Sequence, residues 1–223
     1  MKRLRVLSRT FLNHRYCLIL AMSTCALATT AGLFSLIVFD GTAGKQGPSP
    51  SLWPTSSSIR RDAGKLNLLV FAHPFCPCTR ATLEELSRAL SRVRRPDLLR
   101  KSRGGAPSVS VRVLFVRPSG SAWTTAETWD RAASIPYTTA AWDDGGIEAQ
   151  RFKAQTSGIV LLYDSAGRLL FQGGITGSRG HMGDNYGLQH LLAALDTGQP
   201  ALAGSLVFGC SLATEATQGA QNR

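Results

Sequence analysis

The sequence predicts an α/β domain with a mostly parallel central sheet, helices on both faces and an antiparallel hairpin toward the C-terminal end. Strand-like and helix-like segments alternate along the chain, which favours parallel strands joined by helices. The first strand, 66–72, is apolar on both faces, as a central strand is. Segments 159–163 and 168–172 flank Asp-Ser-Ala-Gly, a hairpin signature with glycine in the turn.

The elements are expected in the order βαβαβαββα. The first helix, 78–93, follows the strand at 66–72 and carries apolar residues at helical spacing. A second strand is predicted at 109–116. Thr-Thr-Ala-Glu at 124–127 is a capping-box pattern, so it predicts a second helix, which ends before Pro136.

The second half of the domain continues this alternation. A short third strand is predicted at 138–142, and Gly145-Gly146 leads into a helix that runs through Phe152. After the hairpin, Asn185 or Asp184 is expected to cap the last helix. That helix is marked by Leu188, Leu191, Leu192 and Leu195.

Five segments are expected along the chain. Residues 1–15 form a basic cytoplasmic arm, and residues 16–39 form a transmembrane anchor. Residues 40–64 are rich in Gly, Pro, Ser and Thr and predict a flexible linker. Residues 65–199 make up the α/β domain. Residues 200–223 form a C-terminal extension that ends in a polar, partly disordered tail.

The uncharged stretch 16–39 carries the expectation of export. As a helix it would be about 36 Å long, enough to span a bilayer. Positive charge on its N-terminal side predicts a single-pass protein of the bacterial inner membrane, with the N-terminus in the cytoplasm and the domain in the periplasm. A signal peptide cleaved near Ala26-Leu27-Ala28 and a lipoprotein acylated at Cys25 remain alternatives. All three export the rest of the chain.

The formal net charge of +11 does not indicate nucleic-acid binding, because the basic residues lack aromatic interleaving or a known motif. One basic group precedes the apolar stretch. The other lies on the first helix and its following loop, where it predicts a solvated face near anionic lipid. The second group is Arg88, Arg92, Arg94, Arg95, Arg100, Lys101 and Arg103.

Cys76 and Cys78 are the principal candidate catalytic residues. They follow a strand and enter the first turn of a helix, where backbone N–H groups and the helix dipole favour thiolate. In an oxidising compartment this pattern predicts a redox pair that exchanges disulfides with exported proteins and is recycled by a redox partner. A bridge between residues so close in sequence would be strained, which predicts an oxidising couple. No cofactor is needed for this chemistry.

Three further residues are candidate accessory groups. His73, as a cation, would stabilise a nearby thiolate. His181 lies in a glycine-rich loop, where it is a proton-transfer group, a metal ligand or an ordinary loop residue. Cys210 leaves an odd thiol outside the membrane and is a resolving cysteine, an intermolecular partner or a buried spectator. Its apolar neighbours predict that this segment docks on the domain.

The segment Phe71–Arg80 resembles the Cys-containing motif of the thioredoxin fold, especially its membrane-anchored TlpA/ResA-type branch. Val160–Leu169 is similar to the hairpin of that branch. The chain also resembles anchored proteins labelled RedB, which pair Cys-Pro-Cys with a segment like Ser178–Asn185. The resemblance implies a thioredoxin-like fold over roughly 66–195, a redox function, and Cys76 as the more exposed, attacking thiol.

Two departures from the family pattern concern the site. The family has two residues between its cysteines, whereas here Pro77 stands alone between them. The family's cis-proline is replaced by Thr156-Ser157-Gly158, where a cis bond would be costly. Pro77, Ser157 and Gly158 are therefore accessory candidates, and the substrate-docking edge is expected to differ from that of thioredoxin.

Three other functions remain open. A copper carrier or metallochaperone would use Cys76 and Cys78 with His73 or His181, since thiolate and imidazole suit soft metals. A thiol peroxidase would use Cys76 in a Pro-x-Cys-Pro setting, although the threonine expected before the cysteine is absent. A binding module with vestigial thiols would do neither.

Overall fold

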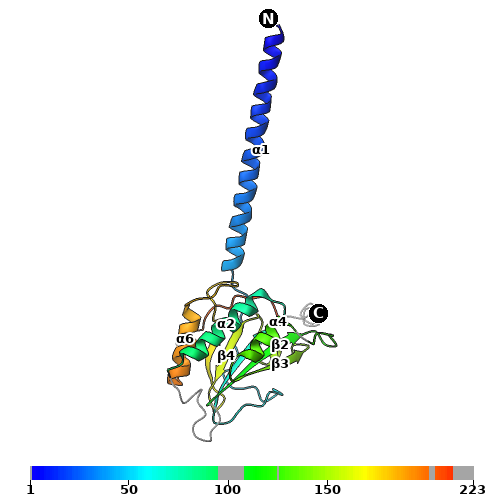
Figure 1. Cartoon of the computed structure of the whole chain (residues 1–223). Helices are drawn as coiled ribbons and strands as arrows, with labels where there is room; N and C mark the ends of the chain where they lie inside the picture. Colours follow the sequence, from blue (N-terminus) through cyan, green and yellow to red (C-terminus); the bar gives the residue numbers. More distant parts are fainter. Residues whose placement is uncertain (1, 95–107, 125, 201–203, 213–223) are drawn as a thin grey trace. The chain divides into compact units, whose positions relative to one another are not determined.

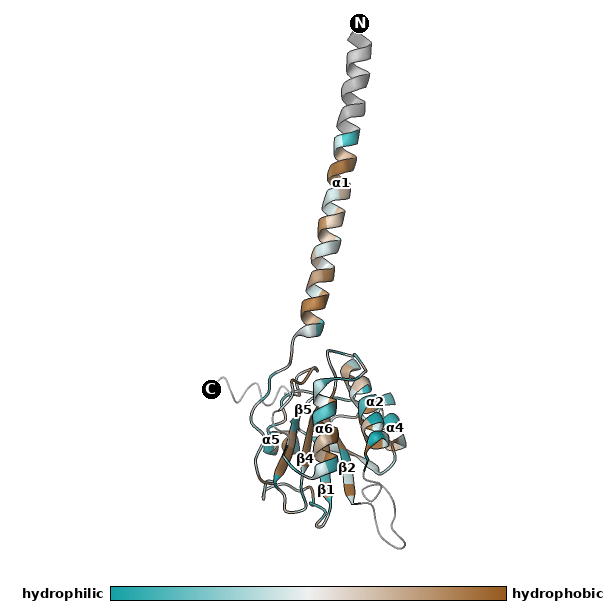
Figure 2. Cartoon of the chain, turned by 90° about the vertical axis from the view of Figure 1, so that its left-hand side faces the viewer, coloured by the Kyte–Doolittle hydropathy of each residue, from teal (hydrophilic) through white to brown (hydrophobic). Residues whose placement is uncertain are grey.

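The computed structural model describes residues 2–94, 108–124, 126–200 and 204–212. The chain divides into two compact units, Met1–Gly41 and Thr42–Arg223. The first is one helix, α1 (Lys2–Gly41). Its part Arg15–Gly41 has a mean hydropathy of 1.8 and is long and apolar enough to cross a membrane, a test that a signal sequence also passes. Figure 2 shows the apolar residues along this helix.

The second unit contains a five-stranded mixed sheet in the order β3-β2-β1-β4-β5. β1 pairs in parallel with β2, which pairs in parallel with β3, whereas β4 runs antiparallel to both β1 and β5. The predicted alternation and the C-terminal hairpin are therefore confirmed. The strands are β1 (Leu66–Ala72), β2 (Val109–Arg117), β3 (Thr138–Asp144), β4 (Ile159–Tyr163) and β5 (Leu169–Gly173).

Helices cover the sheet as the sequence predicts. Leu68 and Val70 of β1 belong to one core, with apolar residues from three helices, α2, α4 and α6, that lie over the same face (Figure 1). Leu69 and Phe71 point the other way, into a core that includes Ala149 of α5. This alternation follows from the two-residue period of a strand. The helices are α2 (Pro77–Arg92), α4 (Glu127–Ser134), α5 (Ile147–Arg151) and α6 (Tyr186–Thr197).

The first residues of α6 and α4 can be compared with the helix caps that the sequence predicts. Asn185 is the cap of α6, because its side chain accepts a hydrogen bond from the Leu188 N–H. The predicted capping box at 124–127 is wrong, since α4 begins after Ala126 without a side-chain cap. The cap of a helix depends on where the backbone turns, and a matching four-residue pattern does not fix that point.

The segment predicted to be a flexible linker is part of the folded unit from Thr42 onward. Trp53 packs edge-on against Phe152 and Tyr163, with ring centroids 5.1 and 5.2 Å apart. The backbone N–H of Trp53 donates to the Gly167 carbonyl at 2.7 Å. The flexible-linker prediction is therefore wrong for this part, because one tryptophan and backbone pairing hold a stretch whose composition suggests disorder.

The C-terminal segment, defined here as residues 204–212, also packs on the domain. Val207, Phe208 and Leu212 are buried. Backbone hydrogen bonds join Val207 to Gly44 and Leu212 to Gln155. The predicted docking of this segment is confirmed. The polar tail from residue 213, predicted to be disordered, lies outside the described residues.

Candidate thiol site

The thiols lie where β1 ends and α2 begins. Cys76 is the N-cap of α2, with extended backbone angles, and Pro77 is the first helical residue. Proline suits this position because its missing N–H would lack a helical partner anyway, and its fixed φ matches the helix. Cys78 follows in the first turn. The positive end of the helix dipole is therefore directed at this pair of sulfurs.

Cys210 approaches the same place from the C-terminal segment. Its Sγ lies 3.0 Å from the Cys76 Sγ. Cys76 and Cys78 are buried, with 3% and 5% of their surface exposed, whereas Cys210 is exposed. The expectation that Cys76 is the more exposed thiol is wrong, because the C-terminal segment brings Cys210 against it.

The pKa values of the three thiols are shifted in different directions. Hydrogen bonds from the Cys78 thiol and then from the Cys210 thiol lower the pKa of Cys76 to about 4, against the opposing effect of burial. The pKa of Cys78 is raised well above its usual value, because its thiol hydrogen bonds to Cys76 and because it is buried. Desolvation, followed by the hydrogen bond to Cys76, raises the pKa of Cys210 to about 11. One thiolate, on Cys76, therefore accepts hydrogen bonds from two protonated thiols.

The surroundings of His73 do not favour the imidazolium cation that would stabilise a nearby thiolate. Its Nδ1 accepts a hydrogen bond from the Phe75 N–H at 3.3 Å. The ring packs edge-on against Trp123, with centroids 5.7 Å apart. Burial lowers the pKa of His73 despite the charge of Cys76. These contacts favour a neutral imidazole that shapes the turn before Cys76.

The loop at Ser157 joins three parts of the site. Its buried Oγ accepts a hydrogen bond from the His73 N–H at 2.9 Å and lies 3.0 Å from the Thr79 Oγ1. Its own N–H donates to the Cys210 carbonyl at 2.8 Å. One serine therefore binds the turn before Cys76, the first turn of α2 and the C-terminal segment.

Gly158 lets this loop approach α2 closely. Its φ is +91°, and an added Cβ would lie 2.7 Å from the Thr82 Oγ1. Its N–H donates to the Phe71 carbonyl at 2.8 Å. Among the described residues no peptide bond is cis, which agrees with the expectation for a loop without proline.

The loop 178–185 contacts the site through its backbone and through Arg179. The Arg179 guanidinium donates to the Gly209 carbonyl at 2.6 Å, and the Gly180 backbone hydrogen bonds to Cys78. His181 is exposed and lies 3.0 Å from the Arg179 carbonyl through Nδ1. The sequence singled out His181, but Arg179 and Gly180 are the residues of this loop that bind Gly209 and Cys78.

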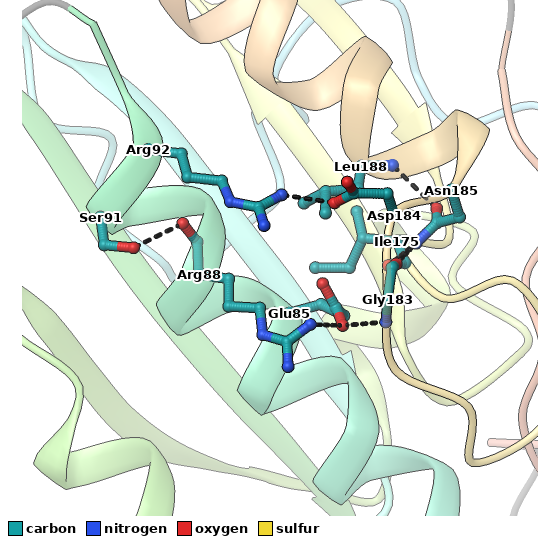
Figure 3. Close-up of polar contacts among 9 residues, drawn as sticks. All are labelled: Glu85, Arg88, Ser91, Arg92, Ile175, Gly183, Asp184, Asn185 and Leu188. Atoms are coloured by element: carbon teal, nitrogen blue, oxygen red, sulfur yellow. Dashed lines mark hydrogen bonds and ion pairs between the residues drawn. The ribbon is translucent and has the colours of Figure 1, made fainter.

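Figure 3 shows how this loop is attached to α2. Glu85 is completely buried, and its Oε1 accepts hydrogen bonds from the Gly183 N–H at 2.6 Å and from Arg88 at 3.2 Å. Arg92 forms an ion pair with Asp184 at 2.5 Å. Sequence reasoning missed Glu85, although a carboxylate on the apolar side of a helix was a visible signal.

A metal site of the kind weighed above would need Cys76, Cys78 and a histidine to converge. Within the ranges that the structure describes, no group of three or more His, Cys, Asp or Glu residues is placed to hold a metal ion. His73 instead accepts from a backbone N–H, and His181 is bonded within its own loop. The contacts of both histidines are thus structural.

Comparison with known proteins supports the fold. No protein-family model matches the chain, and no curated protein matches it significantly. Two crystal structures are similar, an uncharacterized conserved protein from Geobacillus kaustophilus and a hypothetical protein from Sinorhizobium meliloti. They have 19% and 16% identity and TM-scores of 0.52 and 0.51, and each match covers 78% of this chain and 93% or 96% of the other.

A third structure is a secreted disulfide oxidoreductase of Mycobacterium tuberculosis, with 15% identity and a TM-score of 0.37 over 60% of this chain and 81% of that one. The two structures from Geobacillus kaustophilus and Sinorhizobium meliloti, at 19% and 16% identity, show similarity of fold alone. The strand order, the helix that follows β1 and the C-terminal hairpin give the chain a thioredoxin-like fold.

Proposed function

We propose that this chain is a membrane-tethered thiol–disulfide oxidoreductase whose redox pair is Cys76 and Cys78. The observation that carries the proposal is the Cys76 sulfur at the N-cap of α2, whose pKa is lowered by hydrogen bonds from two neighbouring thiols. A thiolate is the nucleophile and the good leaving group of disulfide exchange.

The oxidised pair accepts two electrons from a client dithiol. A client thiolate bonds to one sulfur of the Cys76–Cys78 disulfide, and the other sulfur leaves. The second client thiolate then attacks the mixed disulfide, so that the client is oxidised and both cysteines are reduced. Because the Cys76 thiolate is stabilised, the reduced form is favoured and the couple is oxidising. A separate redox partner must reoxidise the pair.

The location is part of the proposal. The apolar helix Arg15–Gly41 spans the bacterial inner membrane, with the basic N-terminus in the cytoplasm and the domain in the periplasm. A periplasm-dependent reporter fused after Arg60 is expected to be active, and the same reporter fused after Thr10 is expected to be silent. A silent Arg60 fusion beside an active cytoplasmic reporter at that position would contradict export.

The activity is tested on the full chain in detergent micelles. We expect the oxidised protein to form a disulfide in a reduced two-cysteine peptide, with Cys76→Ser abolishing turnover and Cys78→Ser preventing formation of the Cys76–Cys78 disulfide. Cys25→Ser, in α1, is the matched control and should retain activity. Thiols that never pair across a glutathione redox series would refute the proposal, and tight binding of one copper ion by them would support the carrier alternative.

A further inference from the structure

The position of Cys210 is fixed from both sides. The Ser157 N–H donates to the Cys210 carbonyl at 2.8 Å, and the Leu212 N–H donates to the Gln155 carbonyl at 2.9 Å. On the other side, Val207 is buried and accepts a hydrogen bond from Gly44. The Cys210 thiol is therefore held beside Cys76 by a docked segment and is not carried on a free tail.

Gly209 sets how closely this segment approaches. An added Cβ there would lie 1.9 Å from the Ser157 carbonyl oxygen, a distance that no side chain tolerates. Arg179 binds the Gly209 carbonyl from the loop 178–185. The absence of a side chain at residue 209 thus permits the backbone contact that brings Cys210 to Cys76.

Burial separates the roles of the three sulfurs. Cys76 and Cys78 are at most 5% exposed, so a disulfide between them offers little surface to the thiol of a client protein. Cys210 is exposed, and its Sγ lies 3.0 Å from Cys76. A disulfide between Cys76 and Cys210 would include one exposed residue, Cys210.

We propose that Cys210 is a third redox-active cysteine. It displaces Cys78 from the disulfide with Cys76, and the resulting Cys76–Cys210 disulfide is the one that reacts with the client at the protein surface. This inference rests on the proposed oxidoreductase function and deepens it. It assigns the exchange with clients to Cys210 and the internal step to the buried pair.

The internal step is a thiol–disulfide exchange without net oxidation. The Cys210 sulfur loses its proton and bonds to the Cys76 sulfur, the Cys76–Cys78 bond breaks, and Cys78 takes up a proton. A client thiolate then bonds to Cys210, and Cys76 leaves as the thiolate that its surroundings stabilise. The second client thiolate bonds to the client sulfur of the mixed disulfide, the bond from that sulfur to Cys210 breaks, and the released Cys210 takes up a proton. The client has lost two electrons and the protein has gained them.

The inference is tested by mapping disulfides in the full chain after equilibration with reduced and oxidised glutathione, acid quenching and alkylation. Two linkages are expected in the parent protein, Cys76–Cys78 and Cys76–Cys210. Cys78→Ser should form only the second, and Cys210→Ser only the first. A brief pulse of reduced glutathione on the oxidised parent should leave glutathione attached to Cys210.

Two results would overturn the assignment in different ways. If glutathione attaches to Cys76 or Cys78, and Cys210→Ser oxidises the two-cysteine peptide as fast as the parent, the role of Cys210 is refuted while the oxidoreductase function stands. If none of the three thiols pairs at any glutathione ratio, the proposed function fails as well. Retained activity with at least a tenfold loss of rate in Cys210→Ser supports the assignment.

Gly209→Ala gives a second variant that keeps all three thiols. The added methyl must displace the C-terminal segment from Ser157, so the Cys76–Cys210 linkage should become scarce while Cys76–Cys78 persists. A melting temperature recorded for the same sample separates this displacement from global unfolding. An unchanged yield of the Cys76–Cys210 linkage in a folded variant would contradict the placement of Cys210.

Discussion

Ser157→Ala removes the hydroxyl that ties the turn before Cys76 to α2. The Thr79 hydroxyl has one hydrogen and donates it to the His73 carbonyl at 2.9 Å, so the Ser157 hydroxyl donates to Thr79 and accepts from the His73 N–H. The substitution leaves the His73 N–H without its acceptor. Thr79 keeps its own donated bond.

The expected cost follows from this arrangement. The His73 N–H is partly buried, so the loss of its hydrogen-bond acceptor costs about 1–3 kcal/mol. For a domain of this size each kcal/mol lowers the melting temperature by about 2–4 °C, so Ser157→Ala should melt about 4–8 °C below the parent for a cost near 2 kcal/mol. The backbone bond from Ser157 to Cys210 is retained, because alanine keeps the N–H.

The assay is thermal unfolding of the reduced full chain in detergent, followed by near-ultraviolet circular dichroism of the tryptophans. Thr79→Val should cost a similar amount, and the double variant should cost less than the sum, because the two hydroxyls share one bond. Ser157→Thr and Thr79→Ser keep the hydroxyls and are the matched controls. A loss no larger than about 0.5 kcal/mol, the range of ordinary surface substitutions, would refute the reasoning.

Three more predictions concern the thiolate charge of Cys76, the close approach of Gly158 to α2 and the N-cap of α6. The pKa of Cys76 is lowered in the folded protein, so its thiolate stabilises the reduced form at higher pH, and this stability is lost as pH falls through about 4. Thiolate absorbance in the ultraviolet should show this low midpoint, and Cys78→Ala and Cys210→Ala, which remove the donors, should each raise it. An unchanged midpoint in both would contradict the hydrogen bonding. Gly158→Ala should destabilise the domain by about 1–3 kcal/mol in thermal melts, because φ is positive and the Cβ would meet a threonine hydroxyl. Asn185→Ala should cost about 1–2 kcal/mol, because it removes the cap of α6 and the hydrogen bonds that Nδ2 donates to the Ile175 and Gly183 carbonyls; an unchanged melting temperature would contradict this role.

The elements of the fold were predictable because their signals are local. The strand at 66–72, the turn with two cysteines and the helix that follows can each be recognised from a few neighbouring residues, and the structure has all three. The hairpin after residue 159 was predicted from its turn in the same way. What the sequence predicted about Cys76 and Cys78 was therefore their place in the fold.

The surroundings of the site were less predictable because they arise from long-range pairing. Ser157, Arg179 and Cys210 are brought together only by the fold, and nothing adjacent to each in sequence indicates the others. The burial of Cys76 followed from the same cause. The flexible-linker prediction fails at Trp53, because composition averages over a segment, whereas one ring packed against the core can hold that segment in place.

The docking of residues 204–212 has a consequence for how the protein is made. Synthesis and export deliver the chain from its N-terminus, so Cys76 and Cys78 emerge more than 120 residues before Cys210. Until that last segment arrives, the two thiols lack both their cover and one hydrogen-bond donor. A chain without residues 204–212 thus offers its cysteines to any nearby oxidant, and the arrival of this segment is the event that restricts their exchange.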